Sequence, residues 1–365
     1  MSELRVGGAE SMSIALANAL AREGIDVHFA SASGPLRANL DKRIAFHRID
    51  NPNVFPLRVA HTLSLLLREI RPDIIHSHGA TCAMVASAAR KASNVPCVRV
   101  LTHHSRVFRR APGWLAARIM ARTADHYIAI SKDKQEDMVA RGIPREQTSL
   151  IPNFVDVAAV EERVAAVDAA QVRRGLQIPD NAVVLMMAGR VVDTKRFDVF
   201  VKIAAETARR LRPRPVHALV VGDGPELERL RRIACEEGAT IHFLGFQSDI
   251  FPSLAISDAV VFPSEHPEVL PMFLIEASAA GKAIVCSDVP GNREIVTDGE
   301  TGRVVRGDVN VYAGAVMEIV ADTALAERLG AAAHANALQR FDQKRVAQET
   351  IAVYQGLLAA REPKG

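Results

Sequence analysis

The sequence Ala218-Leu-Val-Val-Gly-Asp-Gly-Pro-Glu226 joins an apolar run to a glycine turn and then to a proline that suits the first turn of a helix. The turn lacks the third glycine of a dinucleotide fingerprint, so it indicates topology rather than a ligand. Similar apolar runs recur along the chain, and most are followed by a helical pattern: residues 27–30, 74–76, 97–101, 127–130, 183–188, 240–243, 259–262 and 283–286. The sequence therefore predicts an α/β fold of parallel sheets covered by helices on both faces.

The length of 365 residues suits two or three domains. We expect two Rossmann-like domains, residues 1–156 and residues 157–342, which face a central cleft. In such sheets ligands bind at the carboxyl ends of the strands, so we expect the ligand-binding motifs directly after strands. Residues 157–170 are rich in Ala, Val and Glu and are expected to connect the domains. Residues 343–365 are expected to form a final helix, which packs back across both domains, and a tail.

Hydropathy and cysteine usage exclude several classes of protein. No window approaches about 18 uninterrupted apolar residues, so we expect no membrane span. The first residues show no basic segment followed by an apolar one, so we expect no signal peptide. The cysteines number 4 and lie far apart without metal-ligand spacing. These features predict a cytoplasmic protein with reduced thiols.

The net charge of +3 is unevenly distributed. Residues 1–155 hold 21 Lys and Arg against 13 Asp and Glu, whereas the remainder is acidic. Residues 99–122 contain no acid, and aromatic and aliphatic residues alternate with six arginines: Arg99, Arg106, Arg109, Arg110, Arg118 and Arg122. Such a segment suits peripheral contact with an anionic membrane, although a solvated basic face is an equal alternative. We expect no nucleic-acid partner, because no recognised binding motif accompanies the basic patch.

Three motifs in the first half lie beside predicted strands or helices. Gly7 and Gly8 precede a helical run, where backbone N–H groups can approach a phosphate or sugar, although a tight turn explains them equally well. His76 and His78 share one face at a strand end, but a metal site would need a third ligand. His104 follows the next strand and can orient a hydroxyl group, unless it serves only a structural hydrogen bond.

The second half carries charged groups at two strand ends. Gly189 and Arg190 end the run 183–188, and Lys195 follows, so cations lie where a departing diphosphate can be neutralised. In Pro263-Ser-Glu-His-Pro-Glu-Val-Leu-Pro-Met-Phe-Leu-Ile-Glu-Ala277, Pro271 predicts that a helix begins near it. Glu268 is then on the loop and Glu276 on the helix. Sugar hydroxyls would be hydrogen-bond partners for these two carboxylates, and the N–H groups of residues 272–274 would hold phosphate. A structural alternative is that one glutamate caps the helix and the other lies at the edge of the core.

The order and spacing of these motifs resemble retaining glycosyltransferase family 4, the group 1 glycosyltransferases with the GT-B fold. The resemblance runs from Gly7 to about Tyr354. Its pieces are Gly7-Gly-Ala-Glu10, Asp73-Ile-Ile-His-Ser-His78, Thr102-His-His104, Ile130-Ser131, Ile151-Pro-Asn153-Phe-Val-Asp156, Gly189-Arg190 with Lys195, Val221-Gly-Asp-Gly-Pro-Glu226, Glu268 with Glu276, Gly291-Asn-Arg-Glu294 and Asp298-Gly-Glu-Thr-Gly302.

The resemblance implies transfer of a sugar, with retention, from a nucleotide-diphosphate sugar to a glycan or lipid-linked acceptor. The acceptor-side domain would be residues 1–156 and the nucleotide-sugar domain residues 157–342. It implies catalytic roles for His104, Arg190, Lys195 and Glu268. Donor binding would use Gly7, Gly8, Gly189, Arg190, Lys195, Glu268, Phe273, Leu274 and Glu276. No cofactor or metal is expected, since the chain has no Asp-x-Asp.

Expected roles include cell-envelope or exopolysaccharide synthesis at the inner membrane face. A sugar-nucleotide epimerase and a non-catalytic scaffold of the same fold are the alternatives.

The sequence departs from the family pattern at two places. Val269 replaces the glycine that usually follows the first glutamate. Family members also have an apolar strand before the paired glycines, whereas residues 1–6 include Ser2, Glu3 and Arg5. We therefore expect an interrupted N-terminal sheet and a native start upstream of Met1.

Overall fold

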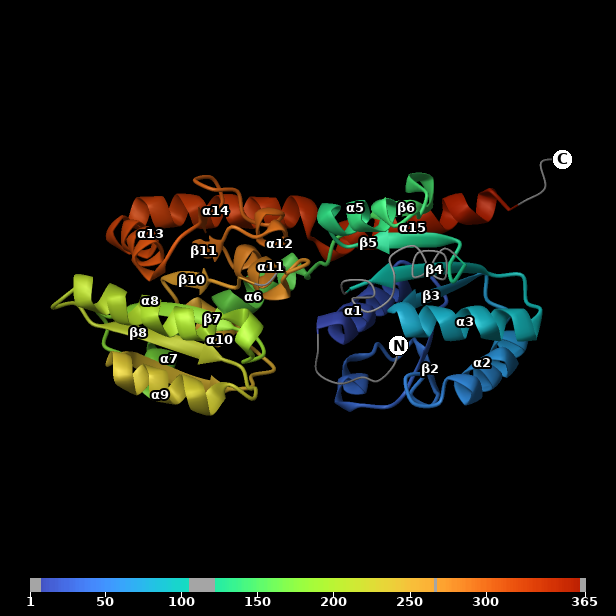
Figure 1. Cartoon of the computed structure of the whole chain (residues 1–365), viewed down its shortest axis with the longest axis horizontal. Helices are drawn as coiled ribbons and strands as arrows, with labels where there is room; N and C mark the ends of the chain where they lie inside the picture. Colours follow the sequence, from blue (N-terminus) through green and yellow to red (C-terminus); the bar gives the residue numbers. More distant parts are fainter. Residues whose placement is uncertain (1–7, 105–121, 266–267, 362–365) are drawn as a thin grey trace. The chain divides into compact units, whose positions relative to one another are not determined.

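The computed structural model describes residues 8–104, 122–265 and 268–361. Contacts divide the chain into two compact units, residues 1–153 with 343–365, and residues 154–342 (Figure 1). Helix α15 (Gln343–Ala359) belongs to the first unit and packs on α1 (Gly8–Arg22) of that unit. The fold class is therefore α/β with parallel sheets, as the apolar runs predict.

The second unit contains a parallel sheet in the order β12-β11-β10-β7-β8-β9. Its continuous apolar runs become strands because the sheet is covered on both faces. The order reverses at the neighbours β7 and β10, which is the point where ligands bind in such sheets. The strands are β7 (Val183–Ala188), β8 (Val216–Val221), β9 (Thr240–Gly245), β10 (Ala259–Phe262), β11 (Ile284–Ser287) and β12 (Arg303–Val305).

Helices cover this sheet in two groups that can be followed in Figure 1. One group packs α8 against α9 and α13, and the other packs α6 and α14 against α11, and α10 against α6 and α7. Their bounds are α6 (Val157–Ala165), α7 (Ala169–Gly175), α8 (Phe197–Arg210), α9 (Leu227–Glu237), α10 (Phe251–Ala255), α11 (Met272–Ala279), α13 (Val309–Ala321) and α14 (Thr323–Arg340). Two short elements, η3 (Asp193–Lys195) and α12 (Pro290–Arg293), lie among the loops.

The expectation that residues 157–170 connect the domains is wrong. The Asp156 carboxylate accepts a hydrogen bond from the N–H of Ala159 and so begins α6. Val157 and Val160 lie three residues apart and are buried. Residues at this spacing share one face of a helix, and this face packs against α10 and α11. The segment is therefore part of the second unit.

The first unit contains two separate parallel sheets among its described strands. One pairs β1 (His28–Ser31) with β2 (Ala45–Arg48). The other has the order β3-β4-β5-β6, with β3 (Ile74–His78), β4 (Val98–His103), β5 (His126–Ala129) and β6 (Thr148–Leu150). Within the described residues no strand joins these two sheets, and residues 1–7 lie outside them.

The helices of the first unit pack chiefly in pairs. Helix α2 (Pro56–Ile70) packs on α3 (Ala80–Ser93), and α3 covers β3 and β4. Helix α5 (Lys132–Ala140) packs on β5 and β6. The short helices are η1 (Pro35–Asn39) and η2 (Arg145–Gln147).

Among the residues with described placement, no single helix is long and apolar enough to cross a membrane. Helices α13 and α14 satisfy the length and composition test only as a pair, and they are bent by 101° at their junction.

Candidate functional site

The loop after β7 is held against the loop after β8 by direct backbone contact. A Cβ atom on Gly222 would lie 1.9 Å from the carbonyl oxygen of Gly189, and one on Gly224 would lie 2.2 Å from that of Val191. Gly222 also has a φ of +140°, a backbone conformation that residues with a side chain rarely adopt. The sequence assigned these glycines to topology alone. Because they fix the backbone on both sides of Arg190, they position this exposed arginine.

Lys195 and Glu268 form an ion pair across the ends of β7 and β10. The Nζ atom of Lys195 lies 2.7 Å from Oε1 of Glu268, and the two side chains are 24% and 17% exposed. The ammonium group also lies 5.2 Å from the ring centroid of Phe262, within the range of a cation–π contact. The structure therefore brings two of the predicted site residues into contact.

Ser264 links the Lys195 loop to Glu268 and was not predicted from the sequence. Its Oγ atom lies 3.0 Å from Oε1 of Glu268 and 3.2 Å from the carbonyl oxygen of Thr194. Ser264 is fully buried, so its hydroxyl holds its partners without competition from water. The available signal was a polar residue two positions after the buried run 259–262.

The segment after β11 packs against the loop that carries Glu268. A Cβ atom on Gly291 would lie 2.2 Å from the carbonyl oxygen of Glu268. The side-chain amide of Asn292 donates to the carbonyl oxygen of Ser287 at 3.1 Å, and the Ser287 hydroxyl donates to the carbonyl oxygen of Ser264. These buried contacts give Gly291 and Asn292 a role in positioning the Glu268 loop, which was not predicted from the sequence.

Glu276 lies inside α11 and carries a perturbed carboxyl group. Burial raises its pKa to about 7, and the positive charge of Arg163 opposes the rise. The helix begins after Pro271, as predicted, and the N–H of Leu274 donates to the carbonyl oxygen of Pro271 at 3.2 Å. Of the two amides expected to hold phosphate, that of Leu274 is thus engaged in the first helical turn. Phe273 is buried, with its ring 6.1 Å from that of Phe262.

The first unit brings three histidines together at the ends of β3 and β4. Nδ1 of His78 lies 3.0 Å from Nε2 of His104, and the two rings stack. His76 hydrogen-bonds to Thr102 at 2.7 Å and to the Tyr354 hydroxyl of α15 at 2.6 Å. Burial lowers the pKa of His76 to about 3 and that of His104 to about 4. The cluster is therefore uncharged at neutral pH, with one imidazole of the hydrogen-bonded pair donating and the other accepting.

The predicted site residues fall into two groups, one in each unit. Gly189, Arg190, Lys195, Glu268, Phe273, Leu274 and Glu276 belong to the second unit. His104 and Gly8 belong to the first, where Gly8 is the exposed first residue of α1, and Gly7 lies outside the described residues. Within the described ranges, no three His, Cys, Asp or Glu side chains gather as a metal site.

Most of the basic segment 99–122 lies outside the described residues, but Arg99 is placed. Its NH2 atom lies 2.6 Å from a carboxylate oxygen of Asp125, and its side chain is 15% exposed. Its NH1 atom donates to the carbonyl oxygen of Arg122 at 2.8 Å. Arg99 is therefore engaged in contacts within the first unit.

Comparison with known proteins identifies the class. Solved structures that share the fold include Anabaena Alr3699/HepE in complex with UDP, with a TM-score of 0.81, 22% identity and coverage of 96% of this chain and 97% of that one. The glycosyltransferase WaaG, involved in lipopolysaccharide biosynthesis, has a TM-score of 0.75 and 15% identity over 98% of each chain. The two units therefore form the GT-B fold of glycosyltransferases.

The family follows from sequence comparison. The model of Glycosyltransferase Family 4 matches residues 6–159, and that of Glycosyl transferases group 1 matches residues 168–336. The chain belongs to the group 1 glycosyltransferases of family 4 and is a glycosyltransferase by class. The resemblance seen in the motifs is confirmed.

Two curated relatives align over nearly the whole chain. The lipopolysaccharide core biosynthesis glycosyltransferase LpsE of Rhizobium meliloti is 26% identical over 97% of this chain and 96% of its own length. The N-acetyl-alpha-D-glucosaminyl L-malate synthase of Bacillus anthracis is 25% identical over 97% and 95%, respectively. These similarities favour a transferase over the sugar-nucleotide epimerase alternative.

Proposed function

We propose that this chain transfers a sugar, with retention of anomeric configuration, from a nucleotide-diphosphate sugar to a glycan or lipid-linked acceptor in cell-envelope or exopolysaccharide synthesis. The Lys195–Glu268 ion pair at the strand-order switch carries the proposal, because it places a cation and a hydroxyl-binding carboxylate side by side. The UDP-glucose complex of a structural neighbour supports the donor class, and the lipopolysaccharide-core relative supports the acceptor class.

The chemistry assigned to the second unit is stabilisation of a leaving group. When the bond between the anomeric carbon and the diphosphate oxygen breaks, its electron pair stays with the diphosphate. Arg190 and Lys195 offset this growing negative charge. The acceptor oxygen bonds to the anomeric carbon, and its proton passes to the leaving diphosphate. When the donor binds, the Lys195 ammonium group leaves Glu268 and pairs with a phosphate. The Glu268 carboxylate is then free to accept hydrogen bonds from sugar hydroxyls.

The remaining site residues orient the two substrates in this proposal. Residues 157–342 bind the donor: Glu276 holds the ribose, and the backbone at Gly189, Phe273 and Leu274 approaches the phosphates. Residues 1–156 receive the acceptor, with Gly7 and Gly8 shaping its junction with the donor. The His104 imidazole contacts the reacting sugar. Two observations support this role of His104. Its ring is buried, which keeps the imidazole uncharged, and the ring hydrogen-bonds to His78.

Metal independence is a further part of the proposal. Two cations and the N-terminus of α11 offer physical substitutes for a metal ion on the diphosphate. Transfer should therefore continue at an unchanged rate in excess EDTA, and recovery of a lost rate by added Mg²⁺ or Mn²⁺ would contradict this part.

The experiment that tests the function is a thermal-shift screen of nucleotide sugars, followed by transfer assays with each hit. A donor at 100 times its Kd stabilises the protein by about 2.7 kcal/mol. Product NMR then reports the anomeric configuration. Donor conversion without an acceptor would support the epimerase, and binding without any turnover would support the scaffold.

Peripheral contact with the inner membrane face is proposed for residues 99–122, and its support is their composition. Replacing Arg106, Arg109 and Arg110 with Gln should reduce co-sedimentation with anionic vesicles and leave binding to neutral vesicles unchanged. Equal co-sedimentation of variant and parent would remove the membrane contact from the proposal.

A further inference from the structure

His78 contacts two other histidine rings at the carboxyl ends of β3 and β4. The centroid of its ring lies 4.6 Å from that of His76 and 5.3 Å from that of His104, and both pairs are stacked. The Nδ1 atom of His78 also lies 3.0 Å from Nε2 of His104. His78 is therefore the middle member of a stack of three rings and is hydrogen-bonded to one of its two neighbours.

His76 is the fixed end of this stack. Its Nδ1 atom is hydrogen-bonded to the hydroxyl of Tyr354 at 2.6 Å, and its Nε2 atom to the hydroxyl of Thr102 at 2.7 Å. One partner lies on α15 and the other on β4, so the ring is tied to two elements besides its own strand. A histidine ring turns easily about its last side-chain bond, and these two hydrogen bonds oppose that rotation.

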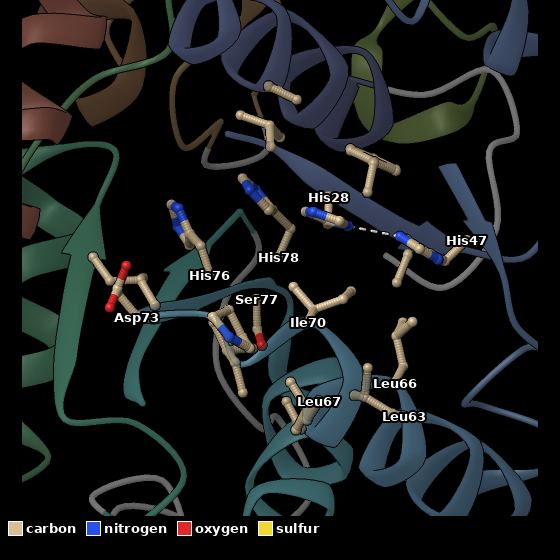
Figure 2. A pocket seen from close by; sticks show the side chains of 18 of the residues that line it. His28, His47, Leu63, Leu66, Leu67, Ile70, Asp73, His76, Ser77 and His78 are labelled. Carbon is tan, nitrogen blue, oxygen red and sulfur yellow. Dashed lines mark hydrogen bonds between the residues drawn. The ribbon is translucent and has the colours of Figure 1, made fainter. Parts of the chain in front are cut away.

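Packing alone does not hold His78 in place. The described residues enclose a cavity of about 460 Å³, and both His76 and His78 line it. Figure 2 shows the two rings side by side. A side chain next to such a cavity lacks van der Waals partners on that side. The orientation of His78 therefore depends on the stacked ring of His76 and on the hydrogen bond to His104.

The hydrogen bond between His78 and His104 joins two uncharged rings. Burial lowers the pKa of His104 to about 4. Burial, together with the neighbouring His76 and His104, lowers the pKa of His78 well below its usual value. Of two neutral imidazoles, one donates the hydrogen bond and the other accepts it. The direction of this hydrogen bond therefore fixes the tautomer of His104, and with it whether the second nitrogen of that ring, Nδ1, donates or accepts.

We infer that His78 is a positioning residue, which holds the His104 ring in one orientation and one tautomer; the inference rests on the sugar contact proposed for His104. A group that contacts a reacting sugar must be held in the correct geometry, because a misplacement of about 1 Å can cost about 10²-fold in rate. His78 supplies this constraint through His104 and needs no contact with the sugar itself.

The test uses the full-length chain and three variants. His78→Phe keeps an aromatic ring in the stack and removes the Nδ1 atom. His78→Asn is the conservative variant, because its amide group places a hydrogen-bonding atom near the position of Nδ1. His217→Phe is the matched control. His217 on β8 and His242 on β9 form a similar pair in the second unit, with Nδ1 2.8 Å from Nε2 and ring centroids 5.1 Å apart.

Nitrogen-15 NMR of the His104 imidazole at neutral pH measures the tautomer, and the signals are assigned by their loss in His104→Ala. The parent, His78→Asn and His217→Phe should each show one bare and one protonated nitrogen. His78→Phe should show two averaged signals, because the ring then exchanges rapidly between tautomers. A single tautomer in His78→Phe would overturn the inference.

Sugar transfer by the same proteins tests the consequence for the reaction. His78→Phe should lower kcat by about tenfold or more with little change in the donor KM, and His78→Asn should recover most of this loss. In the His104→Ala background, His78→Phe should cost no further activity, because its effect passes through His104. An equal loss in both backgrounds would overturn the inference. If His104→Ala alone kept the parent rate, the proposed sugar contact of His104 would fail, and the NMR result would still decide whether His78 sets its tautomer.

Discussion

Nζ of Lys195 lies 2.7 Å from Oε1 of Glu268, and Ser264 holds the same carboxylate oxygen at 3.0 Å. These contacts hold the lysine beyond the end of β7. In the proposed reaction the ammonium group of Lys195 exchanges a carboxylate oxygen for a phosphate oxygen, so little side-chain ordering would be required on donor binding.

Lys195→Ala should lower kcat of sugar transfer by roughly 10²-fold or more, the scale measured when one preorganised charge-stabilising group is removed. Lys202→Ala is the matched control, because Lys202 lies on α8 outside the site and should retain full activity. Initial rates at saturating donor measure the difference. Full activity of the Lys195 variant would refute the assignment of the leaving-group site.

Gly291→Ala should impair transfer without touching any proposed substrate contact. The new methyl group would collide with the carbonyl oxygens of Glu268 at 2.2 Å and of Val269 at 2.7 Å, so the loop carrying Glu268 must move. Gly314→Ala, in the helix α13, has no neighbour within 4 Å of the added Cβ. It should raise stability by about 0.5–1 kcal/mol. Transfer rates and Tm of both variants test the contrast, and equal activity would contradict it.

Glu276 gives the second unit a defined pH dependence. Its carboxyl pKa is about 7 in the folded chain against 4.5 as the reference value, so the folded state holds the proton more tightly. Stability is unaffected below pH 4.5 and is lost as pH rises from 4.5 to about 7. Glu276→Gln removes this loss, and above pH 7 the variant should be more stable by about 3 kcal/mol.

Thermal unfolding between pH 4 and pH 8 measures this effect. The exposed Glu228→Gln serves as a control and should leave the pH profile unchanged. If Glu276→Gln and the parent keep a constant difference in Tm over this range, the carboxyl group is not desolvated. Loss of nucleotide binding in Glu276→Gln would separately support its contact with the ribose.

The sequence predicts the strands and the start of α11 because each of these rests on a local pattern. The runs at 183–188 and 259–262 are continuous and apolar, and Pro271 sets the start of α11. Ser264 and Gly291 escaped prediction since their roles depend on contacts between segments far apart in the chain. The role of Asp156 as a helix cap was likewise hidden, because alanine-rich sequence is compatible with both a connector and a helix.

His104 should remain uncharged throughout the pH range in which the enzyme is assayed. Burial lowers its pKa from 6.5 to about 4, so the folded state binds the proton less tightly than the unfolded chain. Its contribution to stability is complete above pH 6.5 and is lost as pH falls towards 4. NMR titration of the imidazole should give a midpoint near 4 in the folded protein and near 6.5 in urea. A folded-state midpoint near 6.5 would show that water reaches the ring and that the His78–His104 hydrogen bond does not hold it. With the expected midpoint, any acidic limb of kcat/KM above pH 5.5 must come from a group other than His104.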